Sequence, residues 1–283
     1  MRSLIVNEKF DGKKLNTFLL HSFNGLTLNS IYKALRKKDI KINGKRVNEN
    51  YDLHIGDEVQ VYIADNLLFK TVCNIDKVYE DTNIVVFNKP VGIEITGENS
   101  LSSYLTNSGE YQFIEPCHRL DRNTTGLILY AKNKESLDIL INKFKNHEIE
   151  KHYICTVIGI PKVSQSTLTA YLFKDTKKSL VYISDIPKKG YQKIITSYKI
   201  LEIDKANNLS KLDVELHTGR THQIRAHLAH IGHPILGDGK YGINDLNRKF
   251  NKKTQELCSY KLQFNFSTES GILNYLSGKK IIL

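Results

Sequence analysis

The apolar segments of residues 76–283 are short and do not follow a regular strand–helix–strand repeat. Residues 84–87 and 127–132 are continuous apolar segments typical of buried strands, and residues 152–160 and 209–219 add two further predicted strands. Two amphipathic helical patterns interrupt this succession at irregular intervals. A doubly wound parallel sheet needs strands and helices in alternation, so this order of segments predicts an α+β fold built on a mixed sheet.

Two helices are predicted in this part of the chain. The first spans residues 134–149, and its apolar side consists of Leu137, Leu140, Ile141 and Phe144. The second is expected to be capped by Thr221 and to end at Gly232 and Pro234. Its core stripe is expected to consist of Ile224, Leu228 and Ile231. Arg225 lies beside that stripe, which is too close to the apolar face for an ordinary solvated side chain.

Residues 25–40 contain a further amphipathic helical pattern, with a basic outer face. Thr27 is expected to cap this helix, and Asn43-Gly44 between two short β-branched segments predicts a two-residue hairpin turn. The apolar stripe of the helix is expected to consist of Leu28, Ile31, Tyr32 and Leu35. A closing strand is predicted from the alternating apolar residues Val59, Val61 and Ile63.

Lysine and arginine residues are concentrated between Ile31 and Arg46. Seven of them stand against Asp39 alone, an excess of six positive charges in a chain whose net charge is +11. The seven are Lys33, Arg36, Lys37, Lys38, Lys41, Lys45 and Arg46. Most charge runs are solvated faces, but the concentration on one helix and its hairpin favours a surface that contacts RNA phosphates.

Several classes of protein are excluded by what the sequence lacks. It has no run of about eighteen apolar residues and no signal peptide pattern, so the protein is expected to be cytoplasmic and to make no membrane contact. It also has no glycine-rich loop for a nucleoside triphosphate or a dinucleotide. The cysteines are too widely spaced for a zinc ribbon or a redox pair and are expected to be free thiols: Cys73, Cys117, Cys155 and Cys258.

Histidines are unusually frequent between residues 217 and 233. They are His217, His222, His227, His230 and His233. The segment lacks an H-E-x-x-H pattern and has no carboxylate ligand before Asp238, so polar histidines near an RNA surface are a better interpretation than a metal site. A zinc deaminase, which the Pro116-Cys117 pair could suggest, is excluded as well, because Leu120 stands where its metal motif needs a second cysteine.

The segment "CHRLDRNTTG", residues 117–126, places Asp121 between two arginines directly before a predicted buried strand. A partly desolvated carboxylate needs a cationic partner to stay ionised, and Arg225 is a permanently charged candidate. Two interpretations stay equally open from the residues: a structural Asp121–Arg225 pair, or a nucleophile. Lys89, before Pro90, is predicted to be an ordinary loop residue.

Two resemblances follow from longer motifs. "KKLNTFLL", "LNSIYKALRKKDIKINGKRV" and "YDLHIGDEVQVYI" resemble the S4 RNA-binding domain. "VYEDTNIVVFNKPVG", "HRLDRNTTGLILYAK" and "LHTGRTHQIRAHLAHIGHPILGDGKYG" resemble, in the expected order, the three motifs of the RluA-type RNA pseudouridine synthases. The resemblance implies an S4-type α/β module over residues 1–65, a linker over 66–75 and a mixed-sheet catalytic domain over 76–283.

The family resemblance also implies an activity and roles for particular residues. The enzyme would be an isomerase that converts uridine to pseudouridine without a metal or nucleotide cofactor. Asp121 would be the nucleophile, and Tyr153 would stack on the base and help to remove the C5 proton. Arg225 would pair with Asp121, and Arg119 would fill the space of the flipped uridine. RNA-binding residues are expected to be Arg119, Lys33, Arg36, Lys37, Lys41, Lys45, Arg46, Arg220 and His222.

The expected partner of a monomeric enzyme of this kind is RNA, either a 23S-type ribosomal RNA or an assembly intermediate of the large subunit. Transfer RNA is the alternative substrate, and a non-catalytic RNA-binding or ribosome-assembly factor is the alternative function. The chain departs from the family pattern at Val91, at Thr125 and at Leu257-Cys258-Ser259. None of these positions is expected to carry a catalytic group, but they leave the target uridine open.

Overall fold

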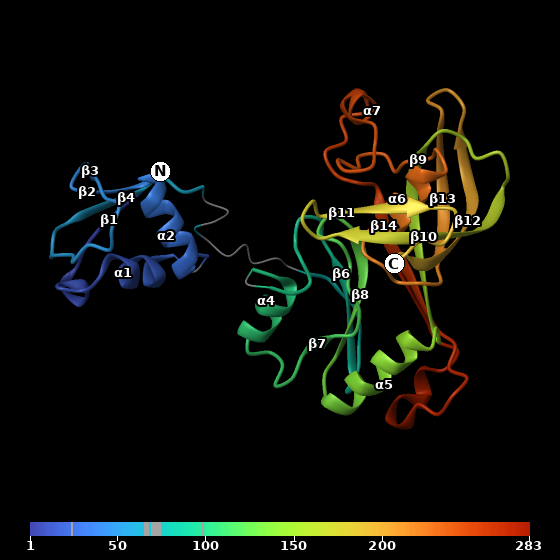
Figure 1. Cartoon of the computed structure of the whole chain (residues 1–283). Coiled ribbons are helices and arrows are strands. Elements are labelled where there is room, and N and C mark those ends of the chain that lie inside the picture. Colours follow the sequence, from blue (N-terminus) through green and yellow to red (C-terminus); the bar gives the residue numbers. More distant parts are fainter. Residues whose placement is uncertain (24, 65–67, 69–74, 98) are drawn as a thin grey trace. The chain divides into compact units, whose positions relative to one another are not determined.

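The computed structural model divides into two compact units, Met1–Asn74 and Ile75–Leu283 (Figure 1). It describes residues 1–23, 25–64, 68, 75–97 and 99–283. The predicted linker over 66–75 lies outside the described residues except for Leu68 and Ile75. In the described part of the chain, no helix is both long and apolar enough to span a membrane.

The first unit is a small antiparallel sheet covered by helices. Its strands are β1 (Arg2–Ile5), β2 (Ile40–Ile42), β3 (Lys45–Arg46) and β4 (Glu58–Val61), in the order β1-β4-β2-β3. Its helices are η1 (Glu8–Phe10), α1 (Leu15–Ser22) and α2 (Leu28–Lys37). The hairpin is confirmed, because Asn43 and Gly44 both have the positive φ angles that a tight two-residue turn requires.

Helix α2 begins where the sequence predicts, because Thr27 and Ser30 form a reciprocal capping box. The predicted apolar stripe is partly wrong. Leu28 and Tyr32 are 47% and 44% exposed, and the buried residues are Ile31, Ala34 and Leu35. These three lie three and four positions apart and share one face, whereas Tyr32 is turned about 100° away from Ile31.

The second unit is one extended mixed sheet with helices packed on it. Its strands are β5 (Lys77–Glu80), β6 (Ile84–Lys89), β7 (Glu115–Pro116), β8 (Thr125–Ala131), β9 (Ile149–Ile158), β10 (Gln165–Asp175), β11 (Leu180–Ser184), β12 (Gln192–Asp204), β13 (Leu209–Leu216), β14 (Leu257–Phe264) and β15 (Lys280–Ile282). Its helices are α4 (Leu101–Asn107), α5 (Lys134–Lys145), α6 (Gln223–His230), α7 (Asn244–Lys249) and η2 (Gly271–Leu276). The predicted α+β class is confirmed.

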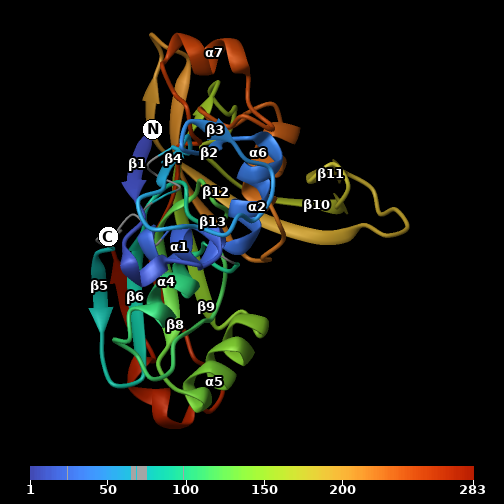
Figure 2. The ribbon, with the colours of Figure 1, turned by 90° about the vertical axis from the view of Figure 1, so that its left-hand side faces the viewer.

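The strand order is β11-β10-β12-β13-β9-β14-β8-β6-β5, with β7 paired to β8 and β15 to β14. Among the described strands, β14 and β8 are parallel and the other pairs are antiparallel. Gly126, at the start of β8, has φ +103°, and a β-carbon there would lie 2.2 Å from the carbonyl oxygen of Ser259. The parallel contact therefore needs glycine at this position. Figure 2 shows β10, β11 and the connection to β12 projecting from the body of the unit.

Both faces of the central strands are buried, which explains why they are continuously apolar in sequence. On one face, Phe87 and Tyr130 pack with side chains of α4 and α6, such as Leu101 and Leu228. On the other face, β6 and β8 pack against α5 and η2. The residues of that second face include Ile84, Val86, Leu127, Leu129, Leu140 and Leu273. The central strands of this sheet thus lie between two layers of helices.

Three details of the predicted helices are wrong. Helix α5 ends at Lys145 and not at residue 149, and Ile141 is 47% exposed, because Leu140 faces the sheet one position earlier. Helix α6 begins at Gln223, and Thr221 is not its cap: the preceding residue, His222, adopts the left-handed conformation. The core stripe of α6 is confirmed: Ile224 and Leu228 are buried in the core cluster, and Ile231, directly after the helix, is partly buried and packs against it.

Candidate active site

A cavity of about 620 Å³ opens beside the parallel strands β8 and β14. This volume is in the usual range of ligand pockets. Asp121 reaches it from the loop before β8, Tyr153 from β9 and Arg225 from the first turn of α6. The three residues that the sequence marks as catalytic therefore meet at one cavity, although they come from segments up to 104 positions apart.

Arg225 lies between two carboxylates. Its Nη1 donates to Asp121 Oδ2 at 2.9 Å, while its Nε and Nη2 donate to the two carboxylate oxygens of Asp238 at 2.6 and 2.9 Å. Burial would lower the pKa of Arg225, but the bonds to Asp238 and Asp121 outweigh it and raise the pKa. The guanidinium is therefore a fixed cation that orients the Asp121 carboxylate toward the cavity.

Asp238 was not predicted as part of this site. It is fully buried, and burial opposes its ionisation, but the hydrogen bonds from Arg225 and from the backbone N–H groups of Lys240 and Tyr241 lower its pKa. The preceding Gly237 has φ +83°, and a β-carbon there would lie 2.0 Å from the carbonyl oxygen of Thr254. The Gly-Asp-Gly turn was the signal in the sequence that could have indicated a tightly held carboxylate.

Lys89 is not an ordinary loop residue, which corrects the prediction. It is fully buried, and its Nζ donates to the carbonyl oxygens of Pro90, Ile93 and Arg122 at 2.8 to 3.0 Å. Burial lowers its pKa to about 8, although the charge of Asp121 acts in the opposite direction. Because Arg122 directly follows Asp121, this lysine ties the loop after β6 to the loop that carries the carboxylate.

Tyr153 lies on the cavity side of β9 and is 4% exposed. Its pKa is raised, first by burial and then by the charge of Asp121. The phenol is therefore neutral in the resting site, and its ring is available as a flat apolar surface. Ile224 and Leu257 also line the cavity, so that the region around the ring is suited to a planar, uncharged group.

The remaining predicted RNA-binding residues are divided between the two units. Arg119 and Arg220 are exposed and line the cavity, whereas His222 is largely buried, with its Nε2 4.0 Å from Asp121 Oδ2. Burial lowers the pKa of His222 to about 4, so it is a neutral polar group. The residues of the first unit are exposed, except for the half-buried Lys41: Lys33, Arg36, Lys37, Lys45 and Arg46.

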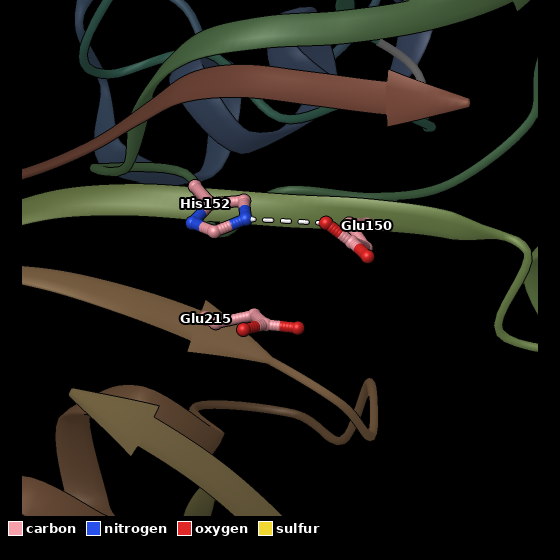
Figure 3. A group of neighbouring side chains, drawn as sticks. All are labelled: Glu150, His152 and Glu215. Atoms are coloured by element: carbon pink, nitrogen blue, oxygen red, sulfur yellow. Dashed lines mark ion pairs between the residues drawn. The ribbon is translucent and has the colours of Figure 1, made fainter. Parts of the chain in front are cut away.

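The five histidines between 217 and 233 do not meet at one point. For example, His227 contacts Thr196, His230 contacts Asp185 and His217 contacts Ser197. Among the described residues, one other group could hold a divalent cation: Glu150, His152 and Glu215, whose ligand atoms lie within 4.8 Å of one another (Figure 3). His152 precedes Tyr153 on β9, so this group lies on the opposite face of the strand from the cavity. An ion bound there would not contact the cavity residues.

Comparisons with known proteins relate the chain to one family. A family model described as RNA pseudouridylate synthase matches residues 83–230. A relative from Mycoplasma capricolum, described as an uncharacterized RNA pseudouridine synthase, is 34% identical, with 100% of this chain and 97% of the relative covered. A ribosomal large subunit pseudouridine synthase C from Buchnera aphidicola is 30% identical, with coverage of 93% and 88%.

A solved structure has a similar fold. The human RNA pseudouridylate synthase domain containing 1 is 25% identical to this chain and superposes with a TM-score of 0.59. The match covers 69% of this chain and 80% of the human protein.

Proposed function

The chain belongs to the RNA pseudouridylate synthase family, and from this premise we propose that it isomerises specific uridines of large-subunit ribosomal RNA with Asp121 as the nucleophile. The observation that carries the proposal is the Asp121 carboxylate at the cavity, held at 2.9 Å by an arginine that a second, buried carboxylate fixes in place. A pair that served only to join two segments would have no need of a cavity beside it.

The reaction breaks the bond between ribose C1′ and uracil N1 and forms a bond between C1′ and C5, while the proton on C5 is lost and N1 gains one. No electrons are gained or lost overall. Asp121 attacks either C1′ or the uracil ring. Because Arg225 is shared by two carboxylates, the three side chains carry one net negative charge, so Asp121 keeps its electron density while its direction is fixed.

Tyr153 has a stacking role in this proposal. The raised pKa keeps its phenol protonated before the reaction, so it cannot take the C5 proton until it has given up its own. Its ring, beside Ile224 and Leu257, is placed to cover one face of the uracil. Stacking on an aromatic ring offsets part of the free energy that a base loses on leaving an RNA helix.

The uridine must be flipped out of the RNA to reach Asp121, since the carboxylate lies in a cavity and not on a protruding surface. Arg119 is exposed at the edge of the same cavity, two positions before Asp121. We assign it the role of occupying the space that the flipped base leaves. The basic residues of the first unit would add contacts to phosphates elsewhere on the RNA.

The choice of large-subunit ribosomal RNA rests on relatives such as the Buchnera ribosomal large subunit pseudouridine synthase C. The test is to map pseudouridines by carbodiimide primer extension in ribosomal RNA from cells that lack the gene. The cells are complemented with the wild type, with Asp121→Asn, or with Asp138→Asn, which changes an exposed carboxylate of α5 in the same way.

The expected result is a reverse-transcription stop that disappears in the deletion and returns with the wild type and Asp138→Asn, but not with Asp121→Asn. If no ribosomal stop is lost, the same mapping on transfer RNA tests the alternative substrate. If Asp121→Asn restores a lost stop, Asp121 is not the nucleophile. A deletion phenotype that Asp121→Asn repairs, with no pseudouridine missing anywhere, would favour a binding factor.

A further inference from the structure

Lys151 is a buried cation in the wall of the candidate active site. It lies on β9 two positions before Tyr153, so the two side chains point to the same face of the strand, and both line the cavity. Lys151 is largely buried, with 9% of its surface exposed. A buried ammonium group costs free energy unless an anion or several hydrogen bonds compensate it.

The other buried lysines of the described chain are compensated. Lys143 donates to Glu148 and Thr268, and Lys89 donates to three carbonyl oxygens. Lys151 differs: among the described residues, no hydrogen-bond acceptor or carboxylate pairs with its Nζ. The nitrogen lies 5.2 Å from the centre of the Phe144 ring, and a β-carbon built on Gly219 would be 3.9 Å from it.

The neighbouring imidazole does not supply a compensating charge. His118 Nε2 accepts a hydrogen bond from the Leu129 N–H, and burial, followed by the charge of Lys151, lowers the pKa of His118 to about 3. His118 is therefore neutral. Burial is also what lowers the pKa of Lys151, to about 8. The lysine is thus mostly charged at neutral pH, and no carboxylate of the described residues pairs with it.

The cavity as a whole has too few carboxylates to compensate its cations. Asp121 is the one carboxylate among the lining residues that the structure describes, and it is bonded to Arg225. The cationic lining residues besides Arg225 are Arg119, Lys145, Lys151, Lys174 and Arg220. Uracil and ribose are neutral, so the anion that fits this arrangement is a phosphodiester of the RNA strand.

We propose that Lys151 binds one phosphodiester adjacent to the flipped uridine and so positions the strand for the reaction at Asp121. This inference rests on the proposed function. The Lys151 side chain is 9% exposed and its ammonium group lies beside the Phe144 ring, so a phosphate that reaches it forms a charge-assisted hydrogen bond in a partly desolvated site, which is stronger than a contact with an exposed lysine. One phosphate is thereby expected to count more than its neighbours.

The test is a methylphosphonate scan of an RNA fragment. The probe is a fragment of large-subunit ribosomal RNA around the mapped uridine or, if none is mapped, the fragment of that transcript that the wild type binds most tightly. Each phosphate is neutralised in turn, and the dissociation constant is measured for the wild type, Lys151→Met, Lys151→Arg and Lys211→Met. Lys211 is an exposed residue of β13 outside the cavity, so its variant controls for a general loss of charge.

The wild type is expected to lose roughly tenfold or more in affinity at one position of the scan. Lys151→Met should bind the unmodified fragment with an affinity lower than that of the wild type by about the same factor, and neutralising that phosphate should not weaken its binding further. Lys151→Arg and Lys211→Met should still lose affinity when that phosphate is neutralised. A Lys151→Met variant that keeps the full sensitivity at every position overturns the proposal. Thermal unfolding of Lys151→Met checks its fold, and if that variant fails to fold, Lys151→Gln, which also removes the charge, takes its place with the same expected loss.

The scan and the pseudouridine mapping can fail separately. Binding that depends on Lys151 and one phosphate, in a protein that modifies no uridine, would retain the phosphate site and refute the proposed activity. Modification of a uridine by a protein whose affinity depends on no particular phosphate would support the proposed activity and refute the phosphate site.

Discussion

Two sets of positive charges, one from each unit, are organised in opposite ways. In the first unit, they follow one another within sixteen positions of the sequence and are mostly exposed. In the second, Lys89, Lys151 and Arg225 come from three distant segments and are buried. Exposed charges act through their number and are screened by salt, whereas buried charges act through the particular atoms that they contact. The first arrangement suits general attraction of RNA and the second suits positioning of one reacting nucleotide.

Asp121→Asn is expected to have the largest effect, because it changes the carboxylate that Arg225 holds at the cavity of the second unit. The substitution keeps the shape and one hydrogen-bond acceptor but removes the carboxylate that we propose as the nucleophile, so turnover should fall by about 10⁴-fold or more while RNA affinity stays similar. Single-turnover conversion and filter binding measure the two effects. Residual turnover within a factor of about ten of the wild type would assign the nucleophile elsewhere.

Asp238→Asn tests whether the second carboxylate positions the first. It leaves Arg225 buried with one full counter-charge, so we expect a turnover loss of about 10²-fold and a decrease in the free energy of unfolding of about 2–4 kcal/mol. Asp185→Asn, at a carboxylate that is 80% exposed and bonded to His230, is the matched control and should change neither quantity by much. If turnover survives a clear loss of stability, Asp238 acts on the fold alone.

The buried histidines of the second unit should make it sensitive to acid. Burial lowers the pKa of His227 to about 4 from an ordinary value of 6.5. The unfolded chain therefore takes up the proton first, so the stabilisation is complete above pH 6.5 and is lost as the pH falls to about 4, by about 2–3 kcal/mol. His227→Gln should flatten this part of the unfolding curve, and His54→Gln, at an exposed residue of the first unit, should not.

The smallest effect is expected at the exposed surface of the first unit. Replacing Arg36 and Lys37 with alanine should weaken RNA binding a few-fold at moderate salt and reduce the slope of log affinity against log salt by about 2. Lys205→Ala, at an exposed turn of the second unit, is the control for a single charge. An unchanged slope would show that this surface does not contact RNA, and the first unit would then have no role in attracting RNA through these charges.

The sequence was a good guide wherever the deciding interactions are local. The Thr27 cap depends on Ser30, three positions away, and the hairpin turn depends on Asn43 and Gly44 themselves. The central strands were recognisable because burial on both faces requires apolar residues at every position. The burial of Leu28, Tyr32 and Ile141 was mispredicted. The local sequence shows that a helix is amphipathic, but the width of the stripe that becomes buried depends on the elements that pack against the helix.

The sequence by itself determined the family motifs, the α+β class and Asp121–Arg225 as a candidate pair. Tertiary structure alone decided that Asp238 holds Arg225, that Lys89 ties two loops together and that Lys151 is a buried cation with which no described acceptor pairs. The physical reason is that the environment of a charge depends on groups brought to it by folding, within a few ångströms and from any part of the chain. A lysine looks the same in a sequence whether water, a carbonyl oxygen or an aromatic ring surrounds it.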